Sequence, residues 1–343
     1  MLYIRVDMNQ TIATGHVMRC LAIADALSRL GETVTFVVAD ENPVELLTKR
    51  GYQTIVLHTD WRDMEGELPA LLAVLRQRRT TKMLIDSYQV TERYLRKLKE
   101  EISVCYMDDL NAFAYPVDML ICYANYSDGF GYPERLTGTE LCLGVQYVPL
   151  RTAFQDCPAK QIPERAKRLL LLSGGTDPFH ILRGMMEALM LSYEELFGRF
   201  DGEIDVICGA WNQDYNWLVE HYKEQSHVRI HRQVADMERY MQQADIAVSA
   251  GGFTLYELCA CGTPAISYAF ADNQLENVRR FDADGLIPYA GDWRKDDVIG
   301  NVLSLLRHLI EDAELRGKCS GQMRRQVDGR GAMRIAEKLL EWR

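Results

Sequence analysis

The sequence has no long hydrophobic run. No uninterrupted apolar stretch in its 343 residues approaches the roughly 20 residues that a membrane-spanning helix needs. The first residues, MLYIRVD, have the pattern of a strand and lack the layout of a signal peptide. We therefore expect a cytoplasmic protein that contacts no membrane.

Positive charge is also in short supply. Lys and Arg number 39 against 49 Asp and Glu, so the formal net charge is −10. Such a chain has no general electrostatic attraction to nucleic acid or to anionic lipid. Nucleic acid is therefore not an expected partner, and any phosphate must be bound by a local site.

The usual cysteine and nucleotide motifs are missing as well. The nine cysteines are an odd number, scattered through apolar runs and without a CxxC pair, which indicates buried thiols and no zinc site. Neither the Walker A pattern nor the GxGxxG fingerprint is present. We expect no ATP, no NAD and no other cofactor.

What the sequence does contain is a regular alternation of short apolar strands and amphipathic helices, typical of parallel-sheet α/β domains. The pattern stops at a segment with two prolines and mixed charge, then resumes. We predict two doubly wound domains facing a cleft. The expected parts are an N-terminal domain at 1–155, a linker at 156–167, a second domain at 168–325 and a C-terminal helix at 326–343, possible packing partner of the first domain.

The first candidate site follows the expected strand at 2–7. The segment MNQTIATGH leads into a helix, so Gly15 and His16 fall at its amino end, with Arg19 one turn further on. Backbone amides and the helix dipole favour an anion there. The same positive end disfavours a protonated imidazole, so His16 is a candidate general base. The alternative is a histidine that merely caps the helix.

Two further glycine loops follow strands of the second domain. Ser173, Gly174 and Gly175 begin the first of these, where a plain turn explains the glycines equally well. In the other loop, Gly251-Gly252 separates a strand from a helix. Amides from Gly251 to Thr254 can hold a diphosphate, and Glu257, one turn on, can accept the ribose hydroxyl protons. The alternative is a βα turn with Glu257 in a surface ion pair.

Three other polar patterns are weaker. Asp282-Ala283-Asp284 has the DxD spacing of metal-dependent glycosyltransferases but lies at a helix end. His227 and His231 lie four apart in a segment that alternates like a strand, which separates their side chains. We expect no metal site from either. Asp108-Asp109 ends an expected strand, and Asp109 is a candidate to orient His16 or a sugar hydroxyl.

Several segments together resemble a known family. They are RVDMNQTIATGHVMRC, IDSY, MDDL, LLSGGTDP and SAGGFTLYELCACGTPAISYAFADNQ. They resemble the UDP-sugar hydrolase of the pseudaminic acid pathway, which acts on UDP-2,4-diacetamido-2,4,6-trideoxy-β-L-altropyranose, and its relatives in spore coat polysaccharide synthesis. That family has the GT-B fold and is similar to the peptidoglycan glycosyltransferase that uses UDP-N-acetylglucosamine.

The resemblance implies roles for particular residues. His16 would activate water, Tyr88 and Asn273 would hold the sugar and the water, and Asp86 and Gln274 would belong to the substrate site. Water would attack the anomeric carbon opposite UDP, without a metal and with inversion. We therefore expect a UDP-sugar hydrolase. The alternatives are a GT-B glycosyltransferase with a UDP-sugar donor and a catalytically silent UDP-sugar binder.

Overall fold

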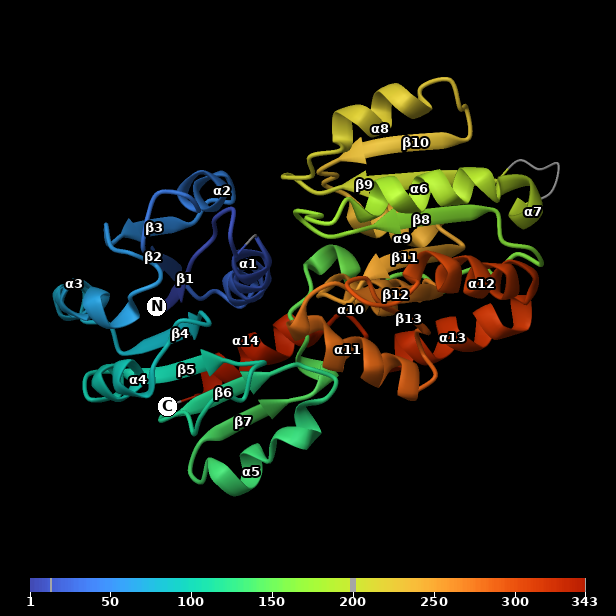
Figure 1. The fold of residues 1–343 in the computed structure, drawn as a ribbon. Helices are drawn as coiled ribbons and strands as arrows, with labels where there is room; N and C mark the ends of the chain where they lie inside the picture. The colour runs from blue at the N-terminus through green and yellow to red at the C-terminus, as the bar shows by residue number, and fades with distance from the viewer. Residues whose placement is uncertain (13, 198–201, 343) are drawn as a thin grey trace. The chain divides into compact units, whose positions relative to one another are not determined.

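The computed structural model describes residues 1–12, 14–197 and 202–342. The chain forms two compact units (Figure 1). The first consists of Met1–Thr152 together with Arg330–Arg343, and the second of Ala153–Gly329. Short 3-10 helices lie at Ser127–Phe130, Val145–Tyr147 and Thr152–Phe154.

The first unit is built on a seven-stranded sheet in which all strands are parallel, in the order β3-β2-β1-β4-β5-β6-β7. The strands are β1 (Leu2–Val6), β2 (Val34–Val38), β3 (Gln53–Val56), β4 (Lys82–Asp86), β5 (Ser103–Met107), β6 (Met119–Cys122) and β7 (Glu140–Leu143). The helices are α1 (Gly15–Arg29), α2 (Val44–Lys49), α3 (Met64–Arg78), α4 (Glu92–Lys99), α5 (Tyr132–Arg135) and α14 (Gly331–Glu341).

The central strands of this sheet are buried on both faces, which is why their residues form continuous apolar runs. The helices start where the sequence supplies caps. The side chain of Asp63 accepts a hydrogen bond from the Gly66 amide at the start of α3, and Thr91 does the same for Tyr94 at α4. At the end of the chain, α14 packs against α1.

The second unit has a six-stranded parallel sheet in the order β10-β9-β8-β11-β12-β13. Its strands are β8 (Arg168–Leu172), β9 (Glu203–Cys208), β10 (Val228–Arg232), β11 (Ile246–Ala250), β12 (Ala265–Ala269) and β13 (Tyr289–Asp292). Its helices are α6 (Ile181–Leu191), α7 (Tyr193–Phe197), α8 (Tyr215–Tyr222), α9 (Met237–Gln243), α10 (Thr254–Cys261), α11 (Asp272–Ala283), α12 (Val298–Glu311) and α13 (Ala313–Gln326).

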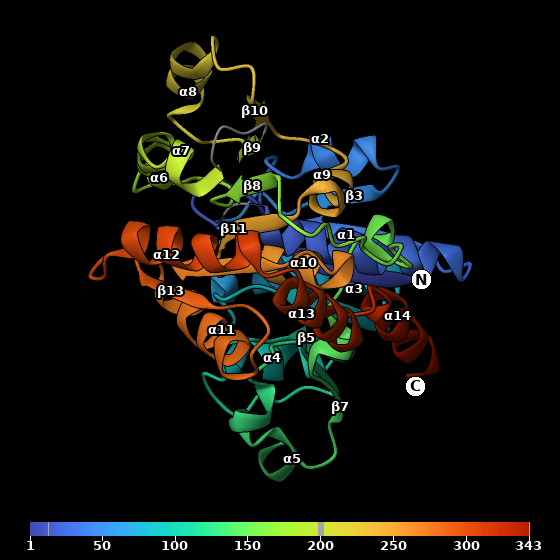
Figure 2. The ribbon, with the colours of Figure 1, turned by 90° about the vertical axis from the view of Figure 1, so that its right-hand side faces the viewer.

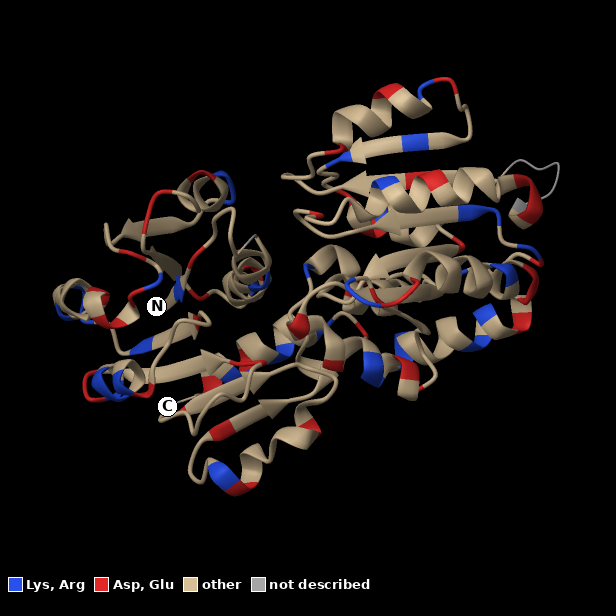
Figure 3. Cartoon of the chain, viewed as in Figure 1, with Lys and Arg blue, Asp and Glu red and all other residues tan. Residues whose placement is uncertain are grey.

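Helices cover both faces of this second sheet. Helices α6 and α12 share one apolar core with the sheet, whereas α9 and α10 lie on the opposite side (Figure 2). The structure therefore confirms the prediction of two doubly wound, parallel-sheet α/β domains. Among the described residues, no helix is both long enough and apolar enough to cross a bilayer. Basic and acidic residues are intermixed along both units (Figure 3).

Strand order also locates the candidate sites. In the first unit the order reverses between β1 and β4, and in the second between β8 and β11. Ligands of open α/β sheets bind at the carboxyl ends of the strands beside such a reversal. The loops after β1 and β4, and those after β8 and β11, are therefore the places to look.

Candidate functional site

In the first unit, His16 and Asp86 come together at the reversal of strand order. His16 lies in the first turn of α1, and Asp86 is the last residue of β4. The His16 Nδ1 atom is 2.7 Å from Asp86 Oδ1. His16 is 8% exposed and Asp86 is 1% exposed, so the contact is shielded from water.

Arg19 binds the same carboxylate with both arms of its guanidinium. Its Nε atom donates to Asp86 Oδ2 at 2.6 Å, and Nη2 donates to Oδ1 at 2.5 Å. Burial by itself would raise the pKa of Asp86, but the charge of Arg19 and the hydrogen bonds from Arg19 and His16 outweigh it and hold the pKa well below its usual range. Asp86 is therefore an ionised carboxylate in a buried, bidentate ion pair.

This ion pair fixes the tautomer of His16. An ionised carboxylate can only accept hydrogen bonds, so a contact of 2.7 Å with Asp86 requires the proton to be on Nδ1. The Arg19 Nη2 atom, 3.0 Å from Nδ1, then makes no hydrogen bond to it, since both groups are donors. In the neutral ring, Nε2 keeps its lone pair and can accept a proton.

Tyr88 and Asp109 complete the cluster. The rings of Tyr88 and His16 meet edge to face, with centroids 4.6 Å apart. The Tyr88 hydroxyl donates to Asp109 Oδ2 at 3.0 Å, and Arg19 Nη1 lies 3.3 Å from the same oxygen. Burial, together with the nearby charge of Asp109, raises the pKa of Tyr88, so the phenol stays protonated. No described residue donates a hydrogen bond to the buried Asp109 Oδ1, which is thus a candidate acceptor for a ligand hydroxyl.

A small pocket opens beside the imidazole within the first unit. His16, Asp86 and Tyr88 line it together with residues that the sequence did not indicate, namely Asp7, Ile12, Trp61, Ser87 and Gln89. Asp7 follows β1 and accepts hydrogen bonds from Arg5 and from the Ala39 amide. Tyr123 was also missed, and its hydroxyl accepts a hydrogen bond from Arg19. Its position just after β6 was the available signal.

The structure separates the roles of the two neighbouring aspartates. Asp108 is 1% exposed. Its carboxylate accepts hydrogen bonds from the amides of Leu110 and Asn111 and from the hydroxyls of Tyr115 and Tyr132. These contacts satisfy Asp108 within the fold and hold the loop after β5, so only Asp109 belongs to the candidate site.

In the second unit, the loop after β8 is held by hydrogen bonds to its own side chains. Gly174 has a φ of +84°, and the Ser173 side chain is fully buried. The carboxylate of Asp177 accepts hydrogen bonds from the Ile181 and Leu182 amides at 2.8 and 3.0 Å. The amino end of α6 therefore already carries an anion from its own chain. The negative charge of Asp177 would disfavour a ligand phosphate at this helix end.

The loop after β11 leads into α10, which begins at Thr254 without a side-chain cap and carries Glu257 in its first turn. Gly251 is held tightly, because its amide donates to the Tyr268 carbonyl at 2.8 Å and its own carbonyl accepts from Asn277 Nδ2 at 2.9 Å. Around the Cα of Gly252, by contrast, a Cβ would meet nothing within 4 Å. This loop offers open space beside the amino end of a helix, as an anion site requires.

The remaining predicted residues of the second unit lie on α10 and α11. Glu257 is half-buried in the first turn of α10, and Asn273 is exposed in the first turn of α11. Gln274 lies beside Gly251, where a Cβ on the glycine would be 3.3 Å from the Gln274 Cβ. Its Oε1 accepts a hydrogen bond from the Phe270 amide at 2.9 Å, which orients the turn into α11. Asn277, one turn after Asn273, was missed by the sequence analysis.

The two adjacent glycines make a matched pair of predictions. An alanine Cβ at Gly251 would lie 2.2 Å from Val278 Cγ1, so we expect Gly251→Ala to lower the free energy of unfolding by about 1–3 kcal/mol. Gly252→Ala should leave stability unchanged. If the diphosphate contacts the backbone at Gly252, the added methyl should weaken UDP binding by about tenfold or more, equivalent to about 1.4 kcal/mol. Urea titration and calorimetric UDP titration measure the two effects. Unchanged UDP affinity in Gly252→Ala would place the diphosphate elsewhere.

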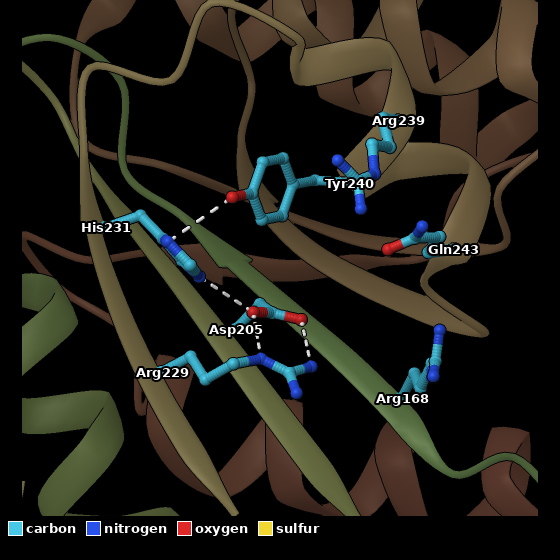
Figure 4. Close-up of a pocket in the computed structure, with 7 residues that line it drawn as sticks. All are labelled: Arg168, Asp205, Arg229, His231, Arg239, Tyr240 and Gln243. Carbon is cyan, nitrogen blue, oxygen red and sulfur yellow. Dashed lines mark hydrogen bonds and ion pairs between the residues drawn. The ribbon is translucent and has the colours of Figure 1, made fainter.

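A larger polar pocket lies away from these loops, on the face of the second sheet near α9 (Figure 4). His231 Nε2 is 2.9 Å from Asp205 Oδ1, and Arg229 binds both oxygens of Asp205 at 2.9 Å. Two other arginines of this pocket, Arg168 and Arg239, pair with Glu203 and Asp236, which do not line it. His231 is thus part of an ion-pair network, and in the part of the chain that the structure describes, no three His, Cys, Asp or Glu side chains form a metal-binding group.

Comparison with known proteins finds similarity to glycosyltransferases and to a polysaccharide biosynthesis protein. Residues 169–290, all in the second unit, match the glycosyltransferase family 28 C-terminal domain. The chain is 22% identical to the spore coat polysaccharide biosynthesis protein SpsG of Bacillus subtilis, over 94% of this chain and 92% of that protein. It is 26% identical to the UDP-N-acetylglucosamine–N-acetylmuramyl-(pentapeptide) pyrophosphoryl-undecaprenol N-acetylglucosamine transferase of Acidithiobacillus ferrooxidans, over 95% and 94% of the two chains. A match to a Methanocaldococcus jannaschii protein is 21% identical and covers 76% of this chain but only 54% of that longer protein.

Solved structures support the same fold. The Acinetobacter baumannii MurG structure superposes with a TM-score of 0.67 at 12% identity, and covers 99% of both chains. The kitacinnamycin glycotransferase gives a TM-score of 0.71 at 16% identity, over 99% of this chain and 98% of that one. The fold is therefore of the GT-B type.

These comparisons correct the expected activity. The sequence analysis predicted a UDP-sugar hydrolase, and that prediction is wrong. The matching domain family, the Acidithiobacillus relative and the structural neighbours are glycosyltransferases, which transfer a sugar to an acceptor. The names of these relatives do not support the pseudaminic acid pathway either. The misreading has a physical cause, since a base beside a nucleotide-sugar site serves an attacking hydroxyl as well as it serves water.

Proposed function

We propose that this protein is a glycosyltransferase that takes its sugar from a UDP-sugar and delivers it to an acceptor hydroxyl. The observation that carries the proposal is the buried cluster of His16, Asp86 and Arg19, in which an ionised carboxylate orients the imidazole. The family match of residues 169–290 supports a donor site in the second unit. One structural neighbour, the rhamnosyltransferase SpnG, has been solved with thymidine diphosphate.

The donor site that we propose is the loop after β11. The diphosphate would lie beside Gly252 and Thr254, where the uncapped start of α10 supplies the positive end of a dipole, whereas the amides of Gly251 and Gly252 already donate to the Tyr268 and Ala250 carbonyls. Glu257 would accept hydrogen bonds from the ribose hydroxyls. Asn273 and Gln274, at the start of α11, would contact the sugar. A site of this kind needs no metal ion, because the helix supplies the positive potential.

His16 would act as the general base. Its Nε2 takes the proton from the acceptor hydroxyl while the acceptor oxygen forms a bond to the anomeric carbon. The bond from that carbon to the diphosphate oxygen breaks on the opposite side, so UDP leaves with the electron pair and the anomeric configuration inverts. Asp86 would stabilise the imidazolium that forms, and Tyr88 and Asp109, which share a hydrogen bond, would bind the hydroxyl groups of the reacting sugar or acceptor.

The experiment that tests this proposal follows UDP release from a panel of UDP-sugars, with and without hydroxyl-bearing acceptors. The acceptors should include free sugars and lipid-linked sugars, and each reaction should be run with and without a chelator. We expect release to depend on an acceptor and to continue in the chelator. Release at an equal rate without an acceptor would contradict transfer. UDP-sugar binding without any release would instead support a silent binder.

A further inference from the structure

Two of the nine cysteines meet in the second unit. All nine are buried free thiols. The Sγ atoms of Cys157 and Cys261 are 3.8 Å apart, although the residues are separated by 104 positions in the chain. Cys157 is 5% exposed and Cys261 is 0% exposed. Both residues are therefore buried, and Cys157 is the more exposed of the two.

The backbone holds both sulfurs in place. Cys261 is the last residue of α10 and is followed by Gly262, whose φ of +65° ends the helix. The carbonyl of Cys157 accepts a hydrogen bond from Arg324 Nη2 at 2.6 Å. An alanine at Gly262 would itself press against Arg324, with its Cβ 2.7 Å from Cδ. The contact between the two sulfurs thus joins two anchored segments.

The surroundings also shift the pKa values of the two thiols in opposite directions. The hydrogen bond from Cys261 lowers the pKa of Cys157 to about 7, against the opposing effect of burial and with help from Arg324. The contact with Cys157 raises the pKa of Cys261. A thiolate is the reactive form of cysteine, and its oxidation also depends on exposure. Cys157, the more exposed of the two residues, is therefore the candidate attacking sulfur, and Cys261 is the candidate resolving sulfur.

We propose that Cys157 and Cys261 form a dithiol site that hydroperoxides oxidise to an intramolecular disulfide. The Cys157 thiolate attacks one peroxide oxygen, the O–O bond breaks, and a sulfenic acid and one water result. The Cys261 sulfur then attacks the sulfenic sulfur, the S–O bond breaks, and a second water leaves. In sum, two thiols and one hydrogen peroxide give one disulfide and two waters, with two electrons passing from sulfur to oxygen.

Forming the disulfide requires only a small movement of the two sulfurs. The sulfurs must approach from 3.8 Å to about 2.05 Å, which is a movement of under about 2 Å. Cys259 provides a contrast on the same helix, because it is also 0% exposed and burial raises its pKa. It lies two residues from Cys261 and so points to another side of α10. Cys259 is therefore a suitable control on the same helix.

The test is to treat the full-length protein with a small excess of hydrogen peroxide, block the remaining thiols in denaturant and map the peptides. We expect a linked peptide pair containing Cys157 and Cys261 and a loss of two titratable thiols per chain. Cys259→Ser should form the same link, whereas Cys157→Ser and Cys261→Ser should not. Retention of all nine thiols, or over-oxidation of Cys157 without a link, would overturn the proposal.

A second measurement uses only the wild-type protein, so it does not depend on whether a variant folds. Phenylarsine oxide binds two thiols only when they are close together. We expect it to block two thiols of the native wild-type protein and to prevent the peroxide-driven link. Wild-type protein that keeps all its titratable thiols after this treatment would count against a dithiol site.

Discussion

Replacing His16 with asparagine is expected to lower turnover by about two to four orders of magnitude, which is the usual contribution of a general base. Asparagine keeps a polar group that can still donate to Asp86, but it has no lone pair of comparable basicity in place of Nε2. The donor site that we propose uses the loop after β11, so UDP affinity should stay unchanged. Steady-state rates with donor and acceptor, combined with UDP titration by calorimetry, give both quantities.

An exposed histidine of the same unit provides the control. His58 has a φ of +56°, a conformation that asparagine tolerates. His58→Asn should therefore leave turnover and UDP affinity as they are. Turnover of His16→Asn within a few-fold of the wild type would remove His16 from the mechanism.

The Asp86→Asn variant should lose about 3–5 kcal/mol of unfolding free energy, because it removes one partner of a buried ion pair. Arg19, which is 5% exposed, would keep its charge without the carboxylate that accepts two of its hydrogen bonds. Turnover should fall as well, since an amide no longer requires the His16 proton to be on Nδ1. Guanidinium titration measures the first effect and the kinetic assay the second.

Acid should act on the same carboxylate. The pKa of Asp86 is held below its value in the unfolded chain, which is about 3.9. A lowered pKa in the folded state means that its stabilisation is complete above the unfolded value and is lost as the pH falls toward the folded one. When the pH is lowered below about 4, the free energy of unfolding should therefore fall less steeply for Asp86→Asn than for the wild type. Asp60→Asn, at an exposed pair with Arg62, should leave stability unchanged because an exposed pair contributes little.

Much of the fold could be predicted because its cause is local. Strands that are covered on both faces, such as β1 and β2, must be apolar throughout, and a sequence shows this directly. His16 and Arg19 share a helix face because they are three residues apart, whereas Asp86, the last residue of β4, and Tyr88, just beyond it, were indicated only by the family resemblance. That these residues act in catalysis stays a prediction.

Other features depend on contacts that spacing does not reveal. Asp108 and Asp109 are adjacent, yet one binds its own loop and the other faces Arg19 and Tyr88. Asp177 caps α6 in a loop whose glycines suggested a ligand. The activity itself was out of reach, because hydrolysis and transfer differ only in the molecule that brings the hydroxyl.

The second unit begins and ends at one point of its surface. A Cβ on Gly329 would lie 2.3 Å from the carbonyl oxygen of Phe154, so the first and last residues of Ala153–Gly329 are neighbours. Such a segment is an insertion whose two junctions are already side by side. Exchanging it as a cassette would test the proposed division of roles, because a chimera should then take its nucleotide preference from the second unit.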